Sequence, residues 1–130
     1  MFLDFEDRPR IYNPEKSQIV DGIDSLNDSF IILENENGDY IQAGGGENRF
    51  TVEVRMNLDK LNFSHWKAEN RGSDNTFKIE INISGVKVQI QQNQAIDRKT
   101  VKRLFESFMD GNYLSDIVCW KDITFMFIEK

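Results

Sequence analysis

Two stretches of this chain alternate between apolar and polar side chains, and this alternation limits the fold more than any other feature. The first stretch covers residues 50–57, and the second covers residues 77–90 and is interrupted only by Ser84-Gly85. Because successive side chains of a β-strand point to opposite faces, the pattern predicts strands with one buried face. The second stretch is predicted to be an antiparallel hairpin whose apolar side chains face one way: Phe77, Ile79, Ile81, Ile83, Val86, Val88 and Ile90.

Other apolar segments predict further strands at 30–33, 40–43, 61–68, 114–120 and 123–128. Phe30 to Leu33 is a continuous apolar run, which is typical of a strand covered on both faces. The segment from Glu34 to Asp39 is predicted to be a turn, since Asn37-Gly38 can supply the positive-φ residues of a tight hairpin. Gly44-Gly45-Gly46 follows and is expected to be a flexible bend between two strands, because glycine weakens the interior of a strand.

Two helices are predicted from apolar residues at helical spacing. The first extends from Glu15 to about Asn27, with Asn13 as its N-cap and Pro14 at its first position. The second is capped by Asp97 and ends at Gly111. The stripes that define them are Ile19, Val20, Ile23 and Leu26 in the first helix, and Val101, Leu104, Phe105 and Phe108 in the second.

The order of these elements predicts an α+β fold. We expect a single antiparallel sheet meander of about six strands, with the N-terminal helix and the second helix, near the C-terminus, packed on one face. The hairpin at 77–91 is expected to lie under the second helix. At 130 residues the chain fits one domain, residues 1–130.

The charge is concentrated in one part of the sequence. The chain has 16 basic and 22 acidic residues, a net charge of −6. No Lys or Arg occurs between Ser17 and Asn48, whereas this segment contains seven acids. Such a region repels nucleic acid and anionic membranes and attracts a basic protein, so a basic partner is expected, with neither nucleic acid nor membrane as a ligand.

The acids of the first helix have a structural and a functional interpretation. They could form a solvated outer face, or they could pair with the bases of the second helix if the two helices lie side by side. However, the first helix has acids toward its C-terminus, where the helix macrodipole disfavours anions. We therefore predict a partner-binding surface formed by Asp21, Asp24, Asp28, Glu34, Glu36, Asp39 and Glu47, with Tyr40 as an aromatic anchor.

Residues that could support catalysis are few. The only histidine is His65 and the only cysteine is Cys119, which lies in an apolar segment. His65 is predicted to be structural, and Cys119 is predicted to be a small buried hydrophobic residue. The sequence has no CxxC or HExxH pattern, and the Gly44–Gly46 run lacks the Lys-Ser/Thr of a phosphate-binding loop. We therefore expect no catalytic, metal-binding or cofactor-binding site.

The sequence also indicates a compartment. No segment approaches the ~20 apolar residues that a membrane-spanning helix needs. The first seven residues contain acids where a signal peptide has a basic flank. A single cysteine also suits a reducing compartment. The expected location is the cytoplasm.

Two segments resemble a known family. Residues 40–50, Tyr-Ile-Gln-Ala-Gly-Gly-Gly-Glu-Asn-Arg-Phe, are similar to a strand and glycine run in immunity proteins of bacterial polymorphic toxins. Residues 101–120, with Phe105, Phe108, Gly111, Leu114, Val118 and Trp120, are similar to the closing helix, the following glycine turn and the Trp-ending strand of the same proteins. The resemblance is to the family that accompanies deaminase toxins, among immunity proteins of contact-dependent inhibition. It covers roughly residues 29–57 and 96–120.

The resemblance implies a protein that binds and neutralises a cognate toxin domain, either over its active site or at a remote surface. It implies that the chain is not an enzyme. An acidic surface suits a toxin with a basic cleft, such as a nuclease or a nucleic-acid deaminase, because complementary charge speeds association. Two alternatives remain from the residues alone, a small enzyme that uses carboxylates and an intracellular adaptor with a non-toxin partner.

Overall fold

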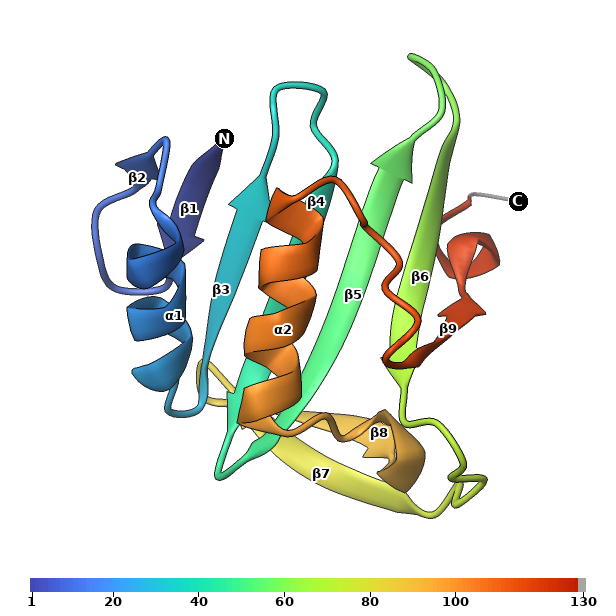
Figure 1. Ribbon diagram of the computed structural model, residues 1–130. Coiled ribbons are helices and arrows are strands. Elements are labelled where there is room, and N and C mark those ends of the chain that lie inside the picture. Colours follow the sequence, from blue (N-terminus) through green and yellow to red (C-terminus); the bar gives the residue numbers. More distant parts are fainter. Residues whose placement is uncertain (129–130) are drawn as a thin grey trace.

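The computed structural model describes residues 1–128, which form a seven-stranded sheet with two helices on one face (Figure 1). Neighbouring strands are antiparallel and follow the order β2-β1-β3-β4-β5-β6-β9. The predicted α+β class is confirmed, and β3 to β6 form a meander. The strands are β1 (Phe2–Phe5), β2 (Ile11–Tyr12), β3 (Ser29–Glu34), β4 (Tyr40–Gly46), β5 (Arg49–Asn57), β6 (Phe63–Glu69) and β9 (Cys119–Asp122).

Strands β1 and β2 were not predicted from the sequence. They form a short hairpin in which Arg10 donates two hydrogen bonds to the Asp4 carboxylate, at 2.8 and 3.0 Å. The Arg10 guanidinium also lies 3.9 Å from the centroid of the Phe2 ring. Leu3, on the other face of β1, is fully buried against the helices. These contacts hold two short strands at the edge of the sheet.

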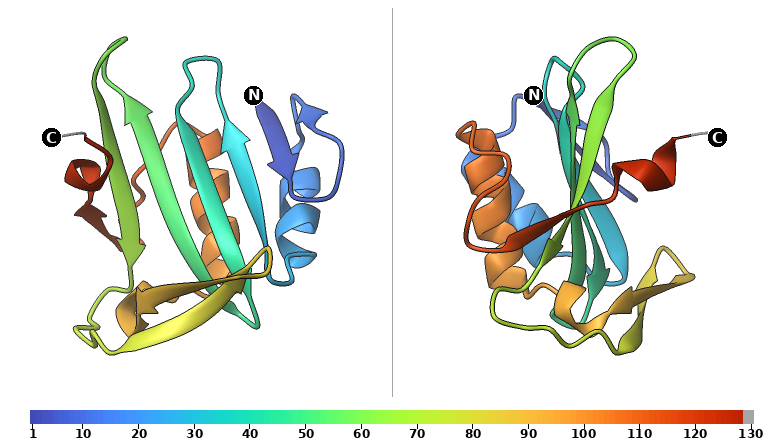
Figure 2. Two further views of the ribbon diagram at one scale, coloured as in Figure 1. Left: turned by 180° about the vertical axis from the view of Figure 1, so that it is seen from behind. Right: turned by 90° about the vertical axis from the view of Figure 1, so that its right-hand side faces the viewer.

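Helices α1 (Lys16–Asp24) and α2 (Arg98–Met109) cover the same face of the sheet, as predicted (Figures 1 and 2). The predicted N-cap of α1 is wrong by two residues. Glu15 is the N-cap and forms a capping box with Gln18, whereas Asn13 lies before it with a φ of 50°. The helix ends at Asp24 rather than near Asn27. In α2, the predicted cap is confirmed, because Asp97 accepts a hydrogen bond from the Thr100 N–H.

The end of α1 is stabilised by α2. Arg98, in the first turn of α2, donates hydrogen bonds to the carbonyl oxygens of Ile23 and Leu26. The last carbonyls of a helix have no intrahelical partners and carry partial negative charge, so a guanidinium is favourable there. This cation offsets the unfavourable position of the acids at the C-terminal end of α1.

The core lies between the helices and the sheet. It contains the predicted stripe of α2 and the alternating residues of β5, Phe50, Val52 and Val54, all of which are buried. Segment 95–97 joins these layers, because Phe50 and Ile96 exchange two backbone hydrogen bonds of 2.8 and 2.9 Å. The largest fully buried apolar side chains include Phe50, Phe105, Phe108, Leu3, Ile19, Ile23, Ile31, Leu33 and Ile41.

The predicted hairpin is confirmed, but its predicted position is wrong. Strands β7 (Lys78–Ile83) and β8 (Val86–Gln91) pair only with each other and form a second sheet. This sheet crosses one end of the main-sheet face that the helices leave uncovered (Figure 2). Lys78 and Glu80 are exposed, as the alternation requires. Phe77, however, precedes the strand and is exposed.

The glycine triplet is part of a strand, so its prediction as a bend is wrong. Gly44 to Gly46 belong to β4, pair with β5 and are buried. The turn lies at Glu47 and Asn48, whose φ angles of 52° and 62° are typical of a type I′ hairpin. A Cβ at Gly44 would approach Ile83 of the second sheet to 2.8 Å. Glycine therefore lets the two sheets come into close contact here.

The last segments also differ from the prediction. Residues 114–118 form turns, and only the four residues of β9 add a strand. The predicted strand at 123–128 is instead the 3₁₀ helix η2 (Thr124–Phe127). Asp122 accepts hydrogen bonds from the backbone and hydroxyl of Thr124, and that hydroxyl accepts one from the His65 N–H. These bonds turn the chain away from the sheet edge.

Replacing Asp97 by alanine is expected to reduce the free energy of unfolding by about 1 kcal/mol, since α2 loses its N-cap. Hydrogen bonds from the Thr100 side chain and backbone lower the pKa of the Asp97 carboxyl. A lowered pKa in the folded state stabilises the protein above the unfolded-state pKa of about 4, and this contribution is lost as the pH falls through the folded-state pKa.

The measurement is urea unfolding at pH 7 and at pH 3, with Asp97→Asn as the control. Asparagine also caps a helix but does not titrate, so it should preserve most of the stability at pH 7. An equal loss for Asp97→Ala at both pH values would contradict the proposed role of the carboxylate.

Candidate functional site

The sheet order converts the uneven charge of the sequence into two charged halves. Residues 1–48 form β1 to β4 and α1, whose strands are contiguous in the sheet, and they contain 11 acids and 3 bases. Residues 49–130 contain 11 acids and 13 bases. One half of the molecule therefore has a net charge of −8 and the other a net charge of +2.

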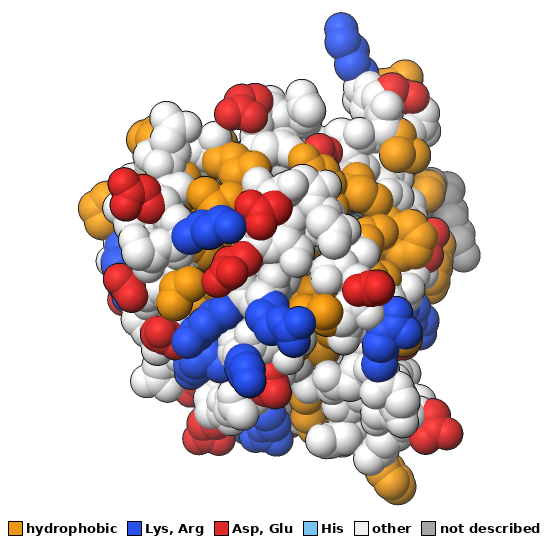
Figure 3. Space-filling view, viewed as in Figure 1, with side chains coloured by type: hydrophobic (Ala, Val, Ile, Leu, Met, Phe, Trp, Pro, Cys, Tyr) orange, Lys and Arg blue, Asp and Glu red, His pale blue; other side chains and the backbone are white. Residues whose placement is uncertain are grey.

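Two of the predicted binding residues lie on α1, on the helical face. Asp21 is exposed and forms no ion pair within residues 1–128. Asp24 forms an ion pair with Lys102 of α2, and Lys16 pairs with Asp110 at 3.2 Å. Figure 3 shows acidic and basic side chains next to each other over the two helices. For Asp24 the structural interpretation therefore applies, because this acid pairs with a base of the neighbouring helix.

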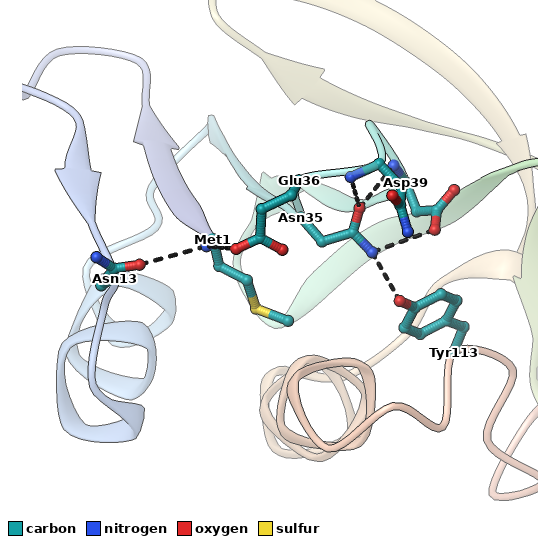
Figure 4. Close-up of polar contacts among 7 residues, drawn as sticks. Met1, Asn13, Asn35, Glu36, Asp39 and Tyr113 are labelled. Atoms are coloured by element: carbon teal, nitrogen blue, oxygen red, sulfur yellow. Dashed lines mark hydrogen bonds and ion pairs between the residues drawn. The ribbon is translucent and has the colours of Figure 1, made fainter. Parts of the chain in front are cut away.

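The loop between β3 and β4 contains Glu36 and Asp39, which have different environments (Figure 4). Glu36 is exposed and lies 3.0 Å from the Met1 amine, and the hydrogen bond between them lowers the pKa of its carboxyl. Asp39 is buried and accepts hydrogen bonds from the Asn35 amide and the Asn57 N–H. Asn35 also donates to the Tyr113 hydroxyl at 2.6 Å. Asp39 therefore holds the loop in shape.

The remaining four predicted residues form two separate pairs. Asp28 and Glu47 lie at the opposite end of the sheet from Glu36, beside the hairpin, where they line a small hollow. Glu34 and Tyr40 are directly opposite each other on β3 and β4 and point to the uncovered face. Burial raises the pKa of both the Glu34 carboxyl and the Tyr40 hydroxyl. The eight residues thus belong to one half of the molecule but occupy four places on it.

The uncovered face contains a charged cluster that includes His65. The Arg55 Nε–H donates to His65 Nδ1 at 3.0 Å, and His65 Nε2 lies 2.6 Å from Glu53 Oε1. Nδ1 is therefore the acceptor, and Nε2 carries the proton that it donates to Glu53. His65 is 1% exposed, so both ring nitrogens are used within the protein. This geometry agrees with a structural role.

Aromatic rings surround the guanidinium of Arg55. It lies 4.0 Å from the ring centroid of Phe63 and 4.8 Å from that of Phe127. The Phe127 ring also lies 4.2 Å from the His65 ring, so η2 covers the cluster from the solvent side. The alternation of β5 placed Arg55 on a wet face, but no sequence signal linked it to Phe127.

Cys119 is exposed at the start of β9, so its prediction as a buried residue is wrong. Its side chain lies on the outermost strand of the sheet, where no further strand from residues 1–128 covers it. The two tryptophans, Trp66 and Trp120, are half-buried. Trp120 donates its indole N–H to the Ser115 carbonyl at 2.9 Å.

Replacing His65 by glutamine is expected to reduce stability by about 1–3 kcal/mol, because Arg55 and Glu53 lose a buried common partner. The folded variant should keep any partner binding of the wild type. The matched control is Cys119→Ser, which should change stability by less than about 0.5 kcal/mol at this exposed position. Thermal unfolding would measure both stability effects, and a binding assay would measure partner binding. A His65→Gln protein that is as stable as wild type but binds no partner would contradict a structural role.

No model of a known protein family matches the chain, and no curated protein matches it either. Within residues 1–128, no three His, Cys, Asp or Glu side chains come together as possible metal ligands. In the same part of the chain, no helix has the length and apolar character needed to cross a membrane.

Proposed function

We propose that this protein is an immunity protein of the polymorphic-toxin type, which acts in the cytoplasm by binding a basic toxin domain and not by catalysis. The observation that carries the proposal is the acidic half, which has 11 acids against 3 bases. The toxin would be a nuclease or a nucleic-acid deaminase, whose substrate-binding cleft must attract phosphate. An acidic protein surface can occupy the same electrostatic field.

The position of the acids supports this proposal. Asp21, Glu36 and Glu47 are exposed on three different elements of the same half, so a basic partner would meet a broad negative field. Asp39 contributes by fixing the β3–β4 loop on which Glu36 lies. Tyr40 supplies an amphipathic ring at the border of this half, of the kind that is enriched at the centres of interfaces.

The resemblance of residues 40–50 to immunity proteins gives separate support. In the structure these residues form β4, the Glu47-Asn48 turn and the start of β5. The segment lies at the centre of the main sheet, since β4 and β5 are the fourth and fifth of its seven strands. Its glycines have close contacts in this fold, so the segment is constrained by packing as well as by binding.

The test combines gene order with binding. An immunity gene should lie directly beside the gene of a large toxin, and the purified protein should form a stable complex with that toxin's C-terminal domain. Co-expression should protect cells from the toxin. An unrelated basic protein of similar size and charge is the control for non-specific attraction. The absence of a complex with the neighbouring toxin at low salt would contradict the proposal.

A further inference from the structure

The uncovered face of the main sheet contains a groove that begins under the β7–β8 hairpin and extends to η2. Two adjoining hollows form it, with volumes of about 350 and 330 Å³. Both are lined by Glu53 and Lys67, so the two hollows adjoin at these side chains. Small-molecule sites in proteins have volumes of about 300–1,000 Å³, which includes the size of this groove.

The first hollow is apolar and has one unpaired polar group. Its walls are formed by Phe30 and Ile32 of the main sheet and by Ile83 and Val88 of the hairpin. Thr51, at its floor, is 8% exposed, and its hydroxyl has no hydrogen-bond partner within residues 1–128. A buried hydroxyl without a partner is costly, and a ligand that pairs with it would gain this energy.

The second hollow is basic. Lys67 and Lys121 are directly opposite each other on β6 and β9, and Lys78 lines the same space. None of these three bases forms an ion pair with another residue of the described chain. Like charges at directly opposite positions destabilise a strand pair. Within residues 1–128 the only acid in the lining is Glu53, which is already bonded to His65.

A single row of side chains connects the two hollows. The strand registers place Ile32, Gln42, Glu53, Lys67 and Lys121 directly opposite one another across five strands. The row therefore changes from apolar at β3 to basic at β9. A ligand that lies along it would meet apolar surface at one end and two ammonium groups at the other.

We infer that this groove binds a small organic anion, a carboxylate with an apolar or aromatic body. The body would fill the space between the hairpin and the sheet. The carboxylate would lie over Lys67 and Lys121, where it would relieve their mutual repulsion. After rotation of its side chain into the groove, the Thr51 hydroxyl would supply a hydrogen bond to a polar atom of the body. This site lies on the opposite side of the sheet from the helices and is independent of the toxin-binding proposal.

The experiment uses 4-phenylbutyrate as the probe and isothermal titration calorimetry of the full-length protein. We expect saturable binding with a Kd below about 1 mM. Two controls separate the parts of the ligand, since 4-phenylbutan-1-ol lacks the charge and butyrate lacks the aromatic body. Both should bind at least about tenfold more weakly. Amide chemical shifts should change around the residues that line the groove.

Two protein variants test the basic end. Lys67→Gln combined with Lys121→Gln should weaken probe binding at least about tenfold, whereas Lys60→Gln in the exposed β5–β6 loop should leave it within about twofold. Without ligand, the double variant should have a higher unfolding temperature than wild type, because the like-charge pair is gone. Added probe should raise the unfolding temperature of wild type only.

Thr51→Val tests the apolar end, because it removes the hydroxyl and keeps the shape. It should weaken binding of a probe that has a polar atom on its body, such as 4-(4-hydroxyphenyl)butyrate, and leave 4-phenylbutyrate binding unchanged. The inference would be overturned by the absence of saturable binding of 4-phenylbutyrate at about 10 mM, ten times the expected Kd limit. Equal binding of acid and alcohol, or equal binding by wild type and the double lysine variant, would also overturn it.

Discussion

Replacing Gly45 by alanine is expected to reduce the free energy of unfolding by about 3–5 kcal/mol, which is enough to unfold a marginally stable domain. Two effects combine at this position. Gly45 has a φ of +139°, which residues with a Cβ rarely adopt. A Cβ at Gly45 would also overlap the backbone carbonyl oxygen of Arg49, which cannot move without breaking the pairing of β4 with β5. Glycine is therefore required here.

The matched control is Gly72→Ala. Gly72 also has a positive φ, of 72°, but a Cβ added there would have no other atom within 4 Å among the described residues. It should therefore show only the backbone cost, about 1–2 kcal/mol. Urea unfolding followed by tryptophan fluorescence and circular dichroism would compare the two variants. If Gly45→Ala were no less stable than Gly72→Ala, the close approach at β4 and β5 would not constrain the sequence.

Changing Asp21, Asp24, Glu34 and Glu36 to lysine should slow association with the proposed toxin partner by about 10- to 1,000-fold at low salt. These acids lie in the half with a net charge of −8, and rim charges act mainly on the rate of encounter. The wild-type association rate should fall steeply as the ionic strength rises beyond about 0.15 M, where the Debye length is about 8 Å. The variant should have a much flatter salt dependence.

A second variant with the same change in net charge is the control. It replaces four acids of the other half by lysine: Asp74, Glu80, Glu106 and Asp116. Stopped-flow or surface-based kinetics at several salt concentrations would compare the three proteins. The control should keep most of the wild-type association rate. If both variants slow association equally, net charge alone decides the rate, and if neither does, the toxin binds elsewhere.

Alternation and capping predicted most of the fold because they reflect local geometry. The paired strands β7 and β8, strand β5 and helix α2 cover close to the residue ranges predicted for them, and Asp97 caps α2 as expected. The prediction of a bend at the glycine triplet is wrong because packing against neighbouring segments holds these flexible residues in an extended strand. Ile83 of the second sheet and the Arg49 carbonyl occupy the space where side chains would be. Arg49 follows the triplet directly after the turn, but Ile83 is distant from it in sequence, so local sequence does not reveal that contact.

The hairpin and the C-terminal segment show what alternation does not specify. The pattern assigns each strand a buried face, but it does not identify the surface that covers this face. The pairing of β7 with β8 was therefore predicted correctly, whereas their packing against the main sheet was not. Residues 123–128 have the apolar content of a strand. However, the hydrogen bonds of Asp122 and Thr124 start a 3₁₀ turn there, and one of them involves His65, 59 positions away.

Of the two surface features, the acidic segment was predicted and the groove was not, because local sequence patterns do not specify tertiary contacts. The acidic segment could be found by counting charges, but its division among a helix, a loop and two strand ends depends on the fold. The groove could not be found at all. Its row of side chains is defined by the register of β5, β6 and β9, and β6 and β9 are distant in the sequence although they pair in the sheet.

The division of the sheet into oppositely charged halves also gives the molecule a permanent electric dipole. In the field of a basic partner such a molecule experiences a torque, which turns the end formed by β1 to β4 toward the partner while the two are still apart. Random encounters between proteins are mostly unproductive because the orientations are wrong, and this lowers typical association rates to about 10⁵–10⁷ M⁻¹s⁻¹. A molecule that arrives already oriented avoids part of this rotational search. The strand order therefore influences how quickly binding occurs, in addition to where.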